Sequence, residues 1–391
     1  MKFCLYCGEE KSDGCFNSRE HVIPKALEGN FNEHNPFILR NVCDTCNHTA
    51  GEHIDLPFGR SWFKSLDRGN NVSDYQKIDE NTNIPLRYMG TVENVVSEGL
   101  VCDFWFGPAG DFVYHFHEPL PPNLKGLAVR TPRIYGDSIA PGFVFLFLKS
   151  DNPKWQRVTA RAIRKHFKRE EVHAPQFHEL GENSWLKPIP RDRLLLSEQL
   201  WDLKEHKGAI TIDINAEPRF MSKLALGVGE LFLQDGFRYS ESAETLRKAM
   251  WEKDFEERGK LGLLGVGFPD VKNKNDDLGE MLSWKYGHSV GLIAIQNLGV
   301  MLFSSFYGKQ TSTIWLTKNR EYCDAEFGDG RFYLMCPAQR KCLGPYRYVD
   351  YLFHNMRIKK IEELAEFEMT LDEIHREQPP KIIQENIEQV E

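Results

Sequence analysis

The chain has 391 residues, 41% of them hydrophobic, so it is long enough for two or three folded domains with sizeable cores. Its formal net charge of -8 argues against a protein coated in nucleic acid, but not against a local basic groove. The most apolar stretch, residues 290–306, is broken by polar residues and glycines, so we expect no membrane span. The sequence begins without the pattern of a secretory signal. We therefore expect a cytoplasmic protein, in which paired cysteines bind metal.

Two C-x-x-C pairs mark the first 50 residues, Cys4 with Cys7 and Cys43 with Cys46. Each pair supplies two thiolates from one tight turn, and four thiolates suit a tetrahedral zinc ion with no open coordination position. A single pair can arise by chance, but two pairs around one Glu-His dipeptide make chance a poor explanation. We predict a structural zinc site.

A carboxylate and an imidazole lie between the two pairs. Glu20 and His21 are adjacent and are followed closely by Pro24, which predicts the end of a strand. The carboxylate can hold a hard cation such as Mg²⁺, and the imidazole can take a proton from water. Asn47 follows the second cysteine pair directly, where we expect a helix to begin, and its carbonyl oxygen can bind the same cation. A surface histidine at a turn is the simpler interpretation of His21.

In chain order the residues are C-x2-C at 4–7, EHVIP at 20–24 and C-x2-CN at 43–47. This order resembles the HNH endonuclease family, in particular the branch with the signature C-x2-C…EHxIP…C-x2-C-N. The resemblance covers about residues 1–60 and implies a ββα-metal finger that a zinc ion holds together. It also implies that His21 is the general base and that Glu20 and Asn47 bind a catalytic Mg²⁺ or Mn²⁺. The four cysteines would be the zinc ligands.

The chain departs from the family pattern at one position. The family's middle asparagine, which orients the base, usually lies nine residues before the last metal ligand, and here that residue is Ile38. Asn35 and Asn41 are nearby, and either can orient the base instead. His48 and His53 also flank the site, and we interpret them as supporting or helix-surface residues.

The sequence from 84 to 148 is typical of β-structure. Two aromatic-rich runs, 99–106 and 111–119, are joined by a Gly-Pro-Ala-Gly segment at 107–110 and predict a hairpin. The apolar run 142–149 predicts a buried strand.

A basic segment follows, with seven Lys or Arg residues and no acidic residue between Lys154 and Arg169. Its periodicity predicts a helix with Arg157, Arg161 and Lys165 along one face. This face can be a solvated surface that pairs with acidic residues elsewhere. It can also contact phosphates and supply charge that the first 60 residues lack, since these hold six basic and nine acidic residues. The second interpretation predicts that the three cations bind DNA.

The C-terminal half shows helices and strands but no chemistry that we can name. We expect an amphipathic helix at 216–236 with a stripe of Phe220, Leu224, Val228 and Leu231, which we interpret as core. Further elements are expected as a helix at 242–254, two strands within 288–308 that turn at 296–297, a strand at 312–317 and a final helix at 351–377. The fold class is therefore α+β.

The predicted organisation is a nuclease domain at 1–70, a β-rich middle region with the basic helix at 71–210, and an α+β region for sensing or dimerisation at 211–391. The expected function is a metal-dependent HNH endonuclease that hydrolyses phosphodiester bonds in DNA, related to bacterial defence against phage or foreign DNA. One alternative is a nuclease gated by a ligand or a partner protein through a C-terminal sensor. The other is a zinc-binding module that holds nucleic acid without cutting it. Because one finger cuts one strand at a time, we also expect a homodimer.

Overall fold

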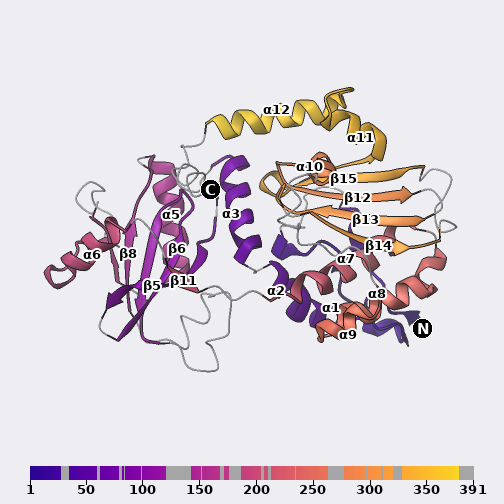
Figure 1. Ribbon diagram of the computed structural model, residues 1–391, viewed down its shortest axis with the longest axis horizontal. Coiled ribbons are helices and arrows are strands. Elements are labelled where there is room, and N and C mark those ends of the chain that lie inside the picture. The colour runs from indigo at the N-terminus through magenta and orange to yellow at the C-terminus, as the bar shows by residue number, and fades with distance from the viewer. Residues whose placement is uncertain are drawn as a thin grey trace. The chain divides into compact units, whose positions relative to one another are not determined.

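The computed structural model describes residues 1–27, 35–59, 62–78, 82, 84–97, 99–119, 142–150, 152–167, 171–175, 186–203, 207–209, 213–233, 235–262, 277–295, 298–309, 311–319 and 328–377. The chain forms two compact units (Figure 1). One unit joins residues 1–60 to residues 213–373, and the other contains residues 61–212 and 374–391. The α+β class is confirmed, and the division into three domains remains a prediction. No described helix is both long enough and apolar enough to cross a membrane.

The N-terminal segment forms the finger of the first unit. It contains β1 (Lys2–Phe3), β2 (Glu10–Lys11), β3 (Glu20–His21), β4 (Ile38–Leu39) and α1 (Asp44–Ala50), followed by a π-helical turn (Gly51–Asp55) and α2 (Leu56–Gly59). Strands β3 and β4 pair antiparallel, with Glu20 opposite Leu39 and His21 opposite Ile38. Helix α1 begins three residues before Asn47, because Cys43 has an extended backbone and serves as the N-cap. The β3–β4–α1 arrangement has the ββα order that the resemblance implies.

A five-stranded antiparallel sheet forms the centre of the first unit. Its order is β14 (Thr311–Thr317), β13 (Gly299–Ser305), β12 (His288–Ile295), β15 (Gly330–Cys336) and β16 (Lys341–Arg347). The predicted strands within 288–308 and at 312–317 are confirmed, whereas β15 and β16 were not predicted. The expected turn at 296–297 lies outside the described residues.

Helices cover both faces of this sheet (Figure 1). Helices α7 (Ala216–Phe232) and α8 (Glu241–Trp251) pack on one face, close to the predicted helices at 216–236 and 242–254. Helix α11 (Tyr348–Asn355) packs on the other face, where Tyr351 stacks on Phe332 at 4.8 Å between ring centroids. The short helices α9 (Phe255–Gly259) and α10 (Asp277–Leu282) complete the α8–β12 connection in its described part.

The C-terminal segment predicted as one helix forms two, α11 and α12 (Glu362–Arg376). The chain leaves helical geometry between them, where Arg357 has a φ of 58° and its amide donates to the His354 carbonyl. The Nδ1 atom of His354 then accepts a hydrogen bond from the Ile361 amide, just before α12 begins.

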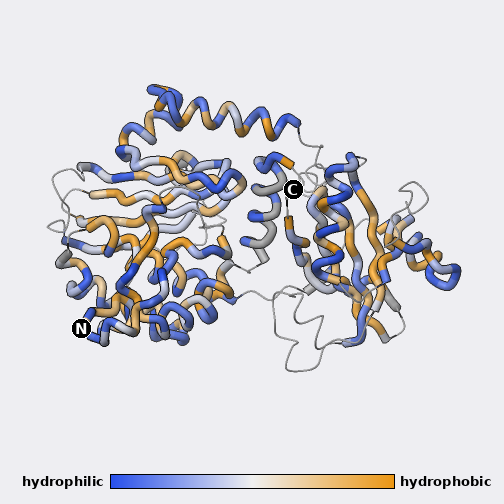
Figure 2. Tube along the Cα trace, turned by 180° about the vertical axis from the view of Figure 1, so that it is seen from behind, coloured by the Kyte–Doolittle hydropathy of each residue, from blue (hydrophilic) through white to orange (hydrophobic). Residues whose placement is uncertain are grey.

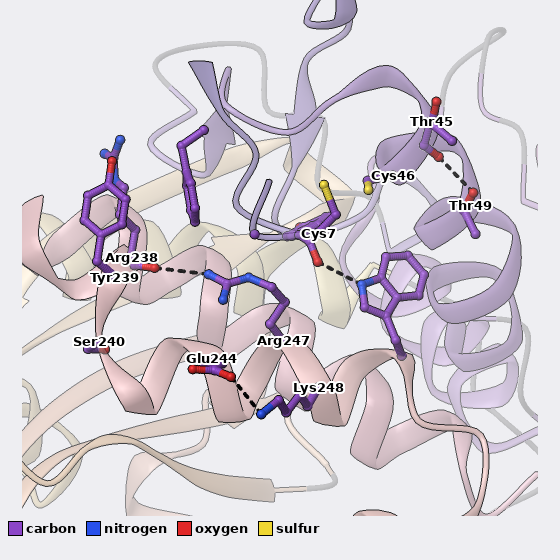
Figure 3. A pocket seen from close by; sticks show the side chains of 14 residues that line it. Cys7, Thr45, Cys46, Thr49, Arg238, Tyr239, Ser240, Glu244, Arg247 and Lys248 are labelled. Carbon is purple, nitrogen blue, oxygen red and sulfur yellow. Dashed lines mark hydrogen bonds and ion pairs between the residues drawn. The ribbon is translucent and has the colours of Figure 1, made fainter. Parts of the chain in front are cut away.

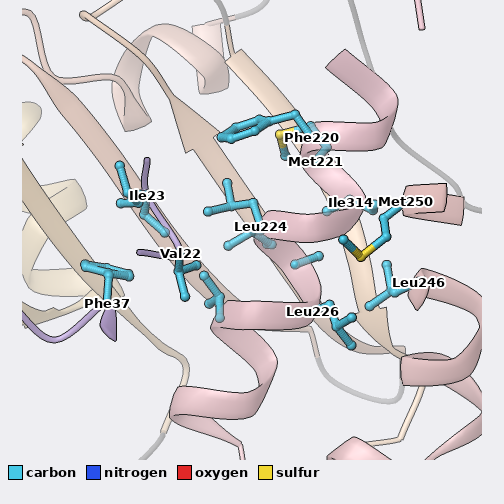
Figure 4. Close-up of a cluster of buried hydrophobic side chains, with 14 of the residues drawn as sticks. Val22, Ile23, Phe37, Phe220, Met221, Leu224, Leu226, Leu246, Met250 and Ile314 are labelled. Atoms are coloured by element: carbon cyan, nitrogen blue, oxygen red, sulfur yellow. The ribbon is translucent and has the colours of Figure 1, made fainter. Parts of the chain in front are cut away.

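The finger shares one hydrophobic core with the C-terminal half of the chain. Val22, Ile23 and Phe37 are fully buried in this core (Figure 4). Their neighbours include side chains of α7, α8 and the sheet, among them Phe220, Met221, Leu224, Leu246, Met250 and Ile314. Helix α7 approaches the residue after β3 so closely that a Cβ on Gly227 would lie 2.8 Å from a methyl group of Val22, so a larger residue at this position would force a shift. The finger is therefore one layer of a larger domain core.

The second unit contains a seven-stranded sheet. Its order is β10 (Leu186–Lys187), β9 (Glu171–His173), β8 (Phe143–Phe147), β7 (Phe112–His117), β6 (Leu100–Phe106), β5 (Arg87–Ser97) and β11 (Gly208–Ala209). Strands β8, β9 and β10 run parallel, and the other pairs are antiparallel. The predicted hairpin is confirmed as β6–β7, and the predicted buried strand as β8. Hydrophobic residues are frequent along these strands (Figure 2).

Among its described residues, the second unit has the helices α3 (Trp62–Tyr75), α5 (Pro153–His166) and α6 (Leu194–Trp201). Helix α5 is the predicted basic helix. Asn152 caps it by accepting a hydrogen bond from the Lys154 amide at 2.9 Å, and Pro153 occupies its first turn. The expected C-terminal end of this helix at Arg169 lies outside the described residues.

Candidate active site

The four cysteines that were predicted to bind zinc form one cluster. The sulfur atoms of Cys4, Cys7, Cys43 and Cys46 all lie within 4.8 Å of one another. The amide of Gly8 closes the first cysteine turn by donating to the Cys4 carbonyl at 2.9 Å, and the φ of Gly8, 74°, favours glycine at this position. Four thiols at this spacing fit a tetrahedral zinc ion and leave no position for a substrate.

Hydrogen bonds at the cluster favour a thiolate. A hydrogen bond from the Cys46 thiol lowers the pKa of Cys4 to about 4, although burial opposes this shift. The backbone amide of Cys43 also donates to the Cys4 sulfur, at 3.3 Å. Thiolates are the form that binds zinc.

Helix α8 supports the turn that carries the first cysteine pair (Figure 3). The Nε atom of Arg247 donates to the Leu5 carbonyl at 2.8 Å, and the indole of Trp251 donates to the Tyr6 carbonyl at 2.9 Å. A cavity of about 810 Å³ lies beside this contact, lined on both sides by residues of the finger and of α8. The turn that carries Cys4 and Cys7 is thus held by a helix that lies about 240 residues away in the sequence.

The adjacent residues of β3 lie in different environments. Glu20 is only 3% exposed, whereas His21 is half-buried. This difference follows from strand geometry, because successive side chains point to opposite faces. The imidazole of His21 is therefore the more accessible of the two groups.

Two buried side chains contact the Glu20 carboxylate, and a third is joined to it through one of them. The hydroxyl of Tyr6 donates to Glu20 Oε1 at 2.8 Å, and the ammonium of Lys223 contacts the same oxygen at 2.6 Å. Lys223 comes from α7 and is fully buried. Its Nζ atom also lies 2.9 Å from both carboxylate oxygens of Asp55. We refer to Tyr6, Glu20, Asp55 and Lys223 as the carboxylate–lysine cluster.

Burial and charge oppose each other in the carboxylate–lysine cluster. Burial disfavours the charged form of Lys223, but the carboxylates of Asp55 and Glu20 outweigh it and raise its pKa. Burial also raises the pKa of Asp55 to about 6. The Lys223 ammonium opposes this shift, and repulsion from the Glu20 carboxylate adds to it. Lys223 therefore stays an ammonium and holds the two carboxylates.

Asn47 is linked to the loop before β3 through Ser18. The Asn47 side-chain amide donates to Ser18 Oγ at 3.0 Å. The Ser18 hydroxyl in turn donates to Asp44 at 2.7 Å, so its oxygen can only accept from Asn47. This network assigns the NH₂ group of Asn47 to Ser18 and leaves the Asn47 carbonyl oxygen for another partner.

Glu20 and Asn47 each offer an oxygen atom of the kind that hard divalent cations bind. Glu20 uses Oε1 toward Tyr6 and Lys223, and no hydrogen bond or ion pair to its Oε2 occurs among the described residues. With the carbonyl oxygen of Asn47, this carboxylate oxygen is a ligand of the type that Mg²⁺ and Mn²⁺ prefer.

The other polar residues near the motif have different surroundings. Asn41 donates to Glu230 of α7 at 2.7 Å, and the side-chain oxygen of Asn35 accepts from the Phe37 amide at 2.9 Å. His48 is exposed and lies 3.5 Å from Glu52, and His53 is exposed as well. The two histidines thus lie on the helix surface.

The three basic residues predicted to bind DNA belong to the second unit. On α5, Arg157 and Lys165 are exposed, and no ion pair involving either of them occurs among the described residues. Arg161 is half-buried and donates to the Thr82 carbonyl at 2.7 Å. The opposite face of α5 is buried through Trp155, Val158 and Ala162.

Comparison with known proteins agrees with the finger geometry. Residues 4–63 match the model of the HNH endonuclease family. Searches among curated proteins and solved structures found no match. The recognition of the family from the sequence is therefore confirmed for the N-terminal segment.

Sequence reasoning did not find Tyr6, Asp55 or Lys223. One signal was present, because Lys223 is the only charged residue in the otherwise uncharged run 220–229 of a predicted core helix. A charged residue on an apolar helix face is usually paired when buried. The sequence did not reveal its partner, since Glu20 lies about 200 residues away.

Proposed function

We propose that the chain is a metal-dependent HNH endonuclease that hydrolyses phosphodiester bonds in DNA. The main support is that residues 4–63 match the HNH endonuclease family while the structure gathers the four cysteines into one cluster. Zinc bound to Cys4, Cys7, Cys43 and Cys46 is structural in this proposal. It orders the β3–β4–α1 finger on which the catalytic residues lie.

His21 accepts a proton from the attacking water in this proposal. Its half-buried position on β3 allows contact with solvent, as a general base requires. Glu20 and Asn47 hold a catalytic Mg²⁺ or Mn²⁺ through one carboxylate oxygen and one amide oxygen. When bound, such a cation supplies positive charge at the phosphate and the leaving oxygen.

Helix α5 supplies the charge for binding the DNA backbone in this proposal. Arg157 and Lys165 are the phosphate contacts, and Arg161 adds charge behind them. The finger segment itself, residues 1–60, is net acidic, so a positive surface elsewhere in the chain is required.

The test is a plasmid cleavage assay with Mg²⁺ or Mn²⁺ that compares the wild type, His21→Ala and His48→Ala. We expect His21→Ala to abolish cleavage with zinc content and DNA affinity nearly unchanged, because the base acts on water and not on binding. The exposed His48 is the matched control and should cleave at the wild-type rate. Wild-type rates for His21→Ala would show that the base lies elsewhere.

The same assay separates the alternative functions. Cleavage only after addition of a ligand or partner would favour a gated nuclease. DNA binding without cleavage under any condition would favour a non-catalytic module. A role in bacterial or phage defence and a cytoplasmic location are further parts of this proposal, and thiolate ligands are consistent with a reducing compartment.

We also propose that the protein is a homodimer, because a single finger cuts one strand at a time and closed two-fold dimers are the commonest oligomers. Light scattering would measure the mass in solution. A monomer that only nicks the plasmid would contradict the dimer without affecting the nuclease proposal.

A further inference from the structure

The carboxylate–lysine cluster constrains one oxygen of Glu20 and not the other. Oε1 of Glu20 accepts from Tyr6 at 2.8 Å and contacts the Lys223 ammonium at 2.6 Å. Both donors are fully buried, so their positions are set by core packing. Two donors on one oxygen fix the carboxylate plane and therefore the direction of Oε2.

Lys223 is too deeply buried to contact a substrate. Its Nζ atom is surrounded by Glu20, by Asp55 and, at 3.4 Å, by the His21 carbonyl. Any influence on catalysis must therefore pass through the residues that it holds. Outer-shell partners of this kind typically change metal affinity 10–100-fold when they are removed.

We propose that Lys223 is a positioning residue, which holds the Glu20 carboxylate from helix α7 so that its second oxygen can bind the catalytic cation. The inference rests on the proposed function, because it assigns Glu20 to the cation. It makes the C-terminal half of the chain part of the active site. The finger motif alone then does not contain all residues needed for cation binding.

The experiment measures Mn²⁺ affinity directly, by electron paramagnetic resonance on the zinc-loaded, full-length protein. The key variant is the double substitution Lys223→Met with Asp55→Asn. It removes one positive and one negative charge, so the net charge around Glu20 is unchanged and only the anchor is lost. The matched control is Lys248→Met with Glu244→Gln, which removes an exposed ion pair of 2.7 Å on α8.

We expect the Kd for Mn²⁺ to rise about 10–100-fold in the double variant and to stay at the wild-type value in the control. Tyr6→Phe removes the second donor to Oε1 without a change of charge and should raise the Kd to a smaller extent. This milder variant decides the question if the double variant does not fold.

A folded, zinc-loaded double variant with the wild-type Kd for Mn²⁺ would overturn the inference and leave Lys223 a purely structural residue. If the double variant fails to fold, an unchanged Kd in Tyr6→Phe has the same meaning. Cleavage by the wild type together with unchanged Mn²⁺ binding in the variants would refute the inference and not the nuclease. A wild type that neither binds Mn²⁺ nor cleaves DNA would refute both.

Discussion

Two polar centres lie in the same core of the first unit, and they are built differently. The cysteine cluster takes its four ligands from residues 4–46, all within the finger. The carboxylate–lysine cluster takes Tyr6, Glu20 and Asp55 from the finger but Lys223 from α7. The first centre uses one residue type in a recurring spacing, whereas the second depends on the packing of distant segments. The finger therefore contains all four candidate zinc ligands, while the ammonium beside its candidate catalytic carboxylate comes from the C-terminal half.

The largest effect is expected from Cys43→Ser, which removes one ligand of the cysteine cluster. We expect loss of zinc and unfolding of the finger, because a closed zinc site contributes about 10–16 kcal/mol of binding free energy to folding. Metal analysis and circular dichroism would measure both changes. Cys15→Ser is the control, since Cys15 lies outside the cluster. A folded finger without zinc would contradict the structural role of the metal.

A fragment of residues 1–70 separates the finger from α7 and the sheet. We expect it to bind zinc but to lack a cooperative melting transition. The buried side chains Val22, Ile23 and Phe37 lose their partners, and each contributes about 1.5–3 kcal/mol when buried. Thermal melting and amide hydrogen exchange with zinc present would test this. A fragment with slow exchange and a sharp transition would show that the finger is autonomous.

The single substitution Lys223→Met leaves two buried carboxylates without their ammonium. We expect the free energy of unfolding to fall by about 3–5 kcal/mol, as for other buried ion pairs that lose one partner. Chemical denaturation would measure it. The double variant with Asp55→Asn should recover part of the loss, because one of the two charges is removed. Equal stability of single and double variants would mean that Asp55 takes up a proton when Lys223 is removed.

Replacing Arg157 and Lys165 of α5 by glutamine tests whether this helix of the second unit binds DNA. We expect weaker binding to all DNA sequences and a salt dependence shallower by roughly two released counterions, because phosphate contacts carry no base information. Salt-titrated binding would measure the slope. Arg161→Gln alone, which removes the contact with Thr82, serves as the comparison for a structural effect. An unchanged slope in the double variant would remove α5 from the DNA interface.

The smallest effect on stability is expected where the turn that carries Cys4 and Cys7 contacts α8. Trp251→Phe removes the indole donor from the Tyr6 carbonyl and should cost on the order of 1 kcal/mol, the usual value for one hydrogen bond. Zinc content should not change. If zinc were lost as in Cys43→Ser, the cysteine cluster would depend on the C-terminal half as strongly as the carboxylate–lysine cluster does.

Local patterns predicted much of the fold. The C-x-x-C pairs, the hairpin at 107–110 and the helix at 216–236 each depend on residues close together in the chain, and each is confirmed. Strands β15 and β16 were missed because their sequences lack clear alternation, and β16 contains Gly344 and Pro345. Proline is tolerated there because β16 is the edge strand of the sheet.

Residue types at short, fixed spacings were enough to predict the cysteine cluster and the match of the N-terminal segment to the HNH endonuclease family. The pairing of Lys223 with Glu20 and Asp55, and the packing of Val22 against Gly227, depend on the folded chain. A lysine on an apolar helix face reveals that a partner must exist, because a buried unpaired ammonium is too costly. The choice of that partner depends on how α7 packs against β3, and this packing is the sum of many contacts between segments about 200 residues apart.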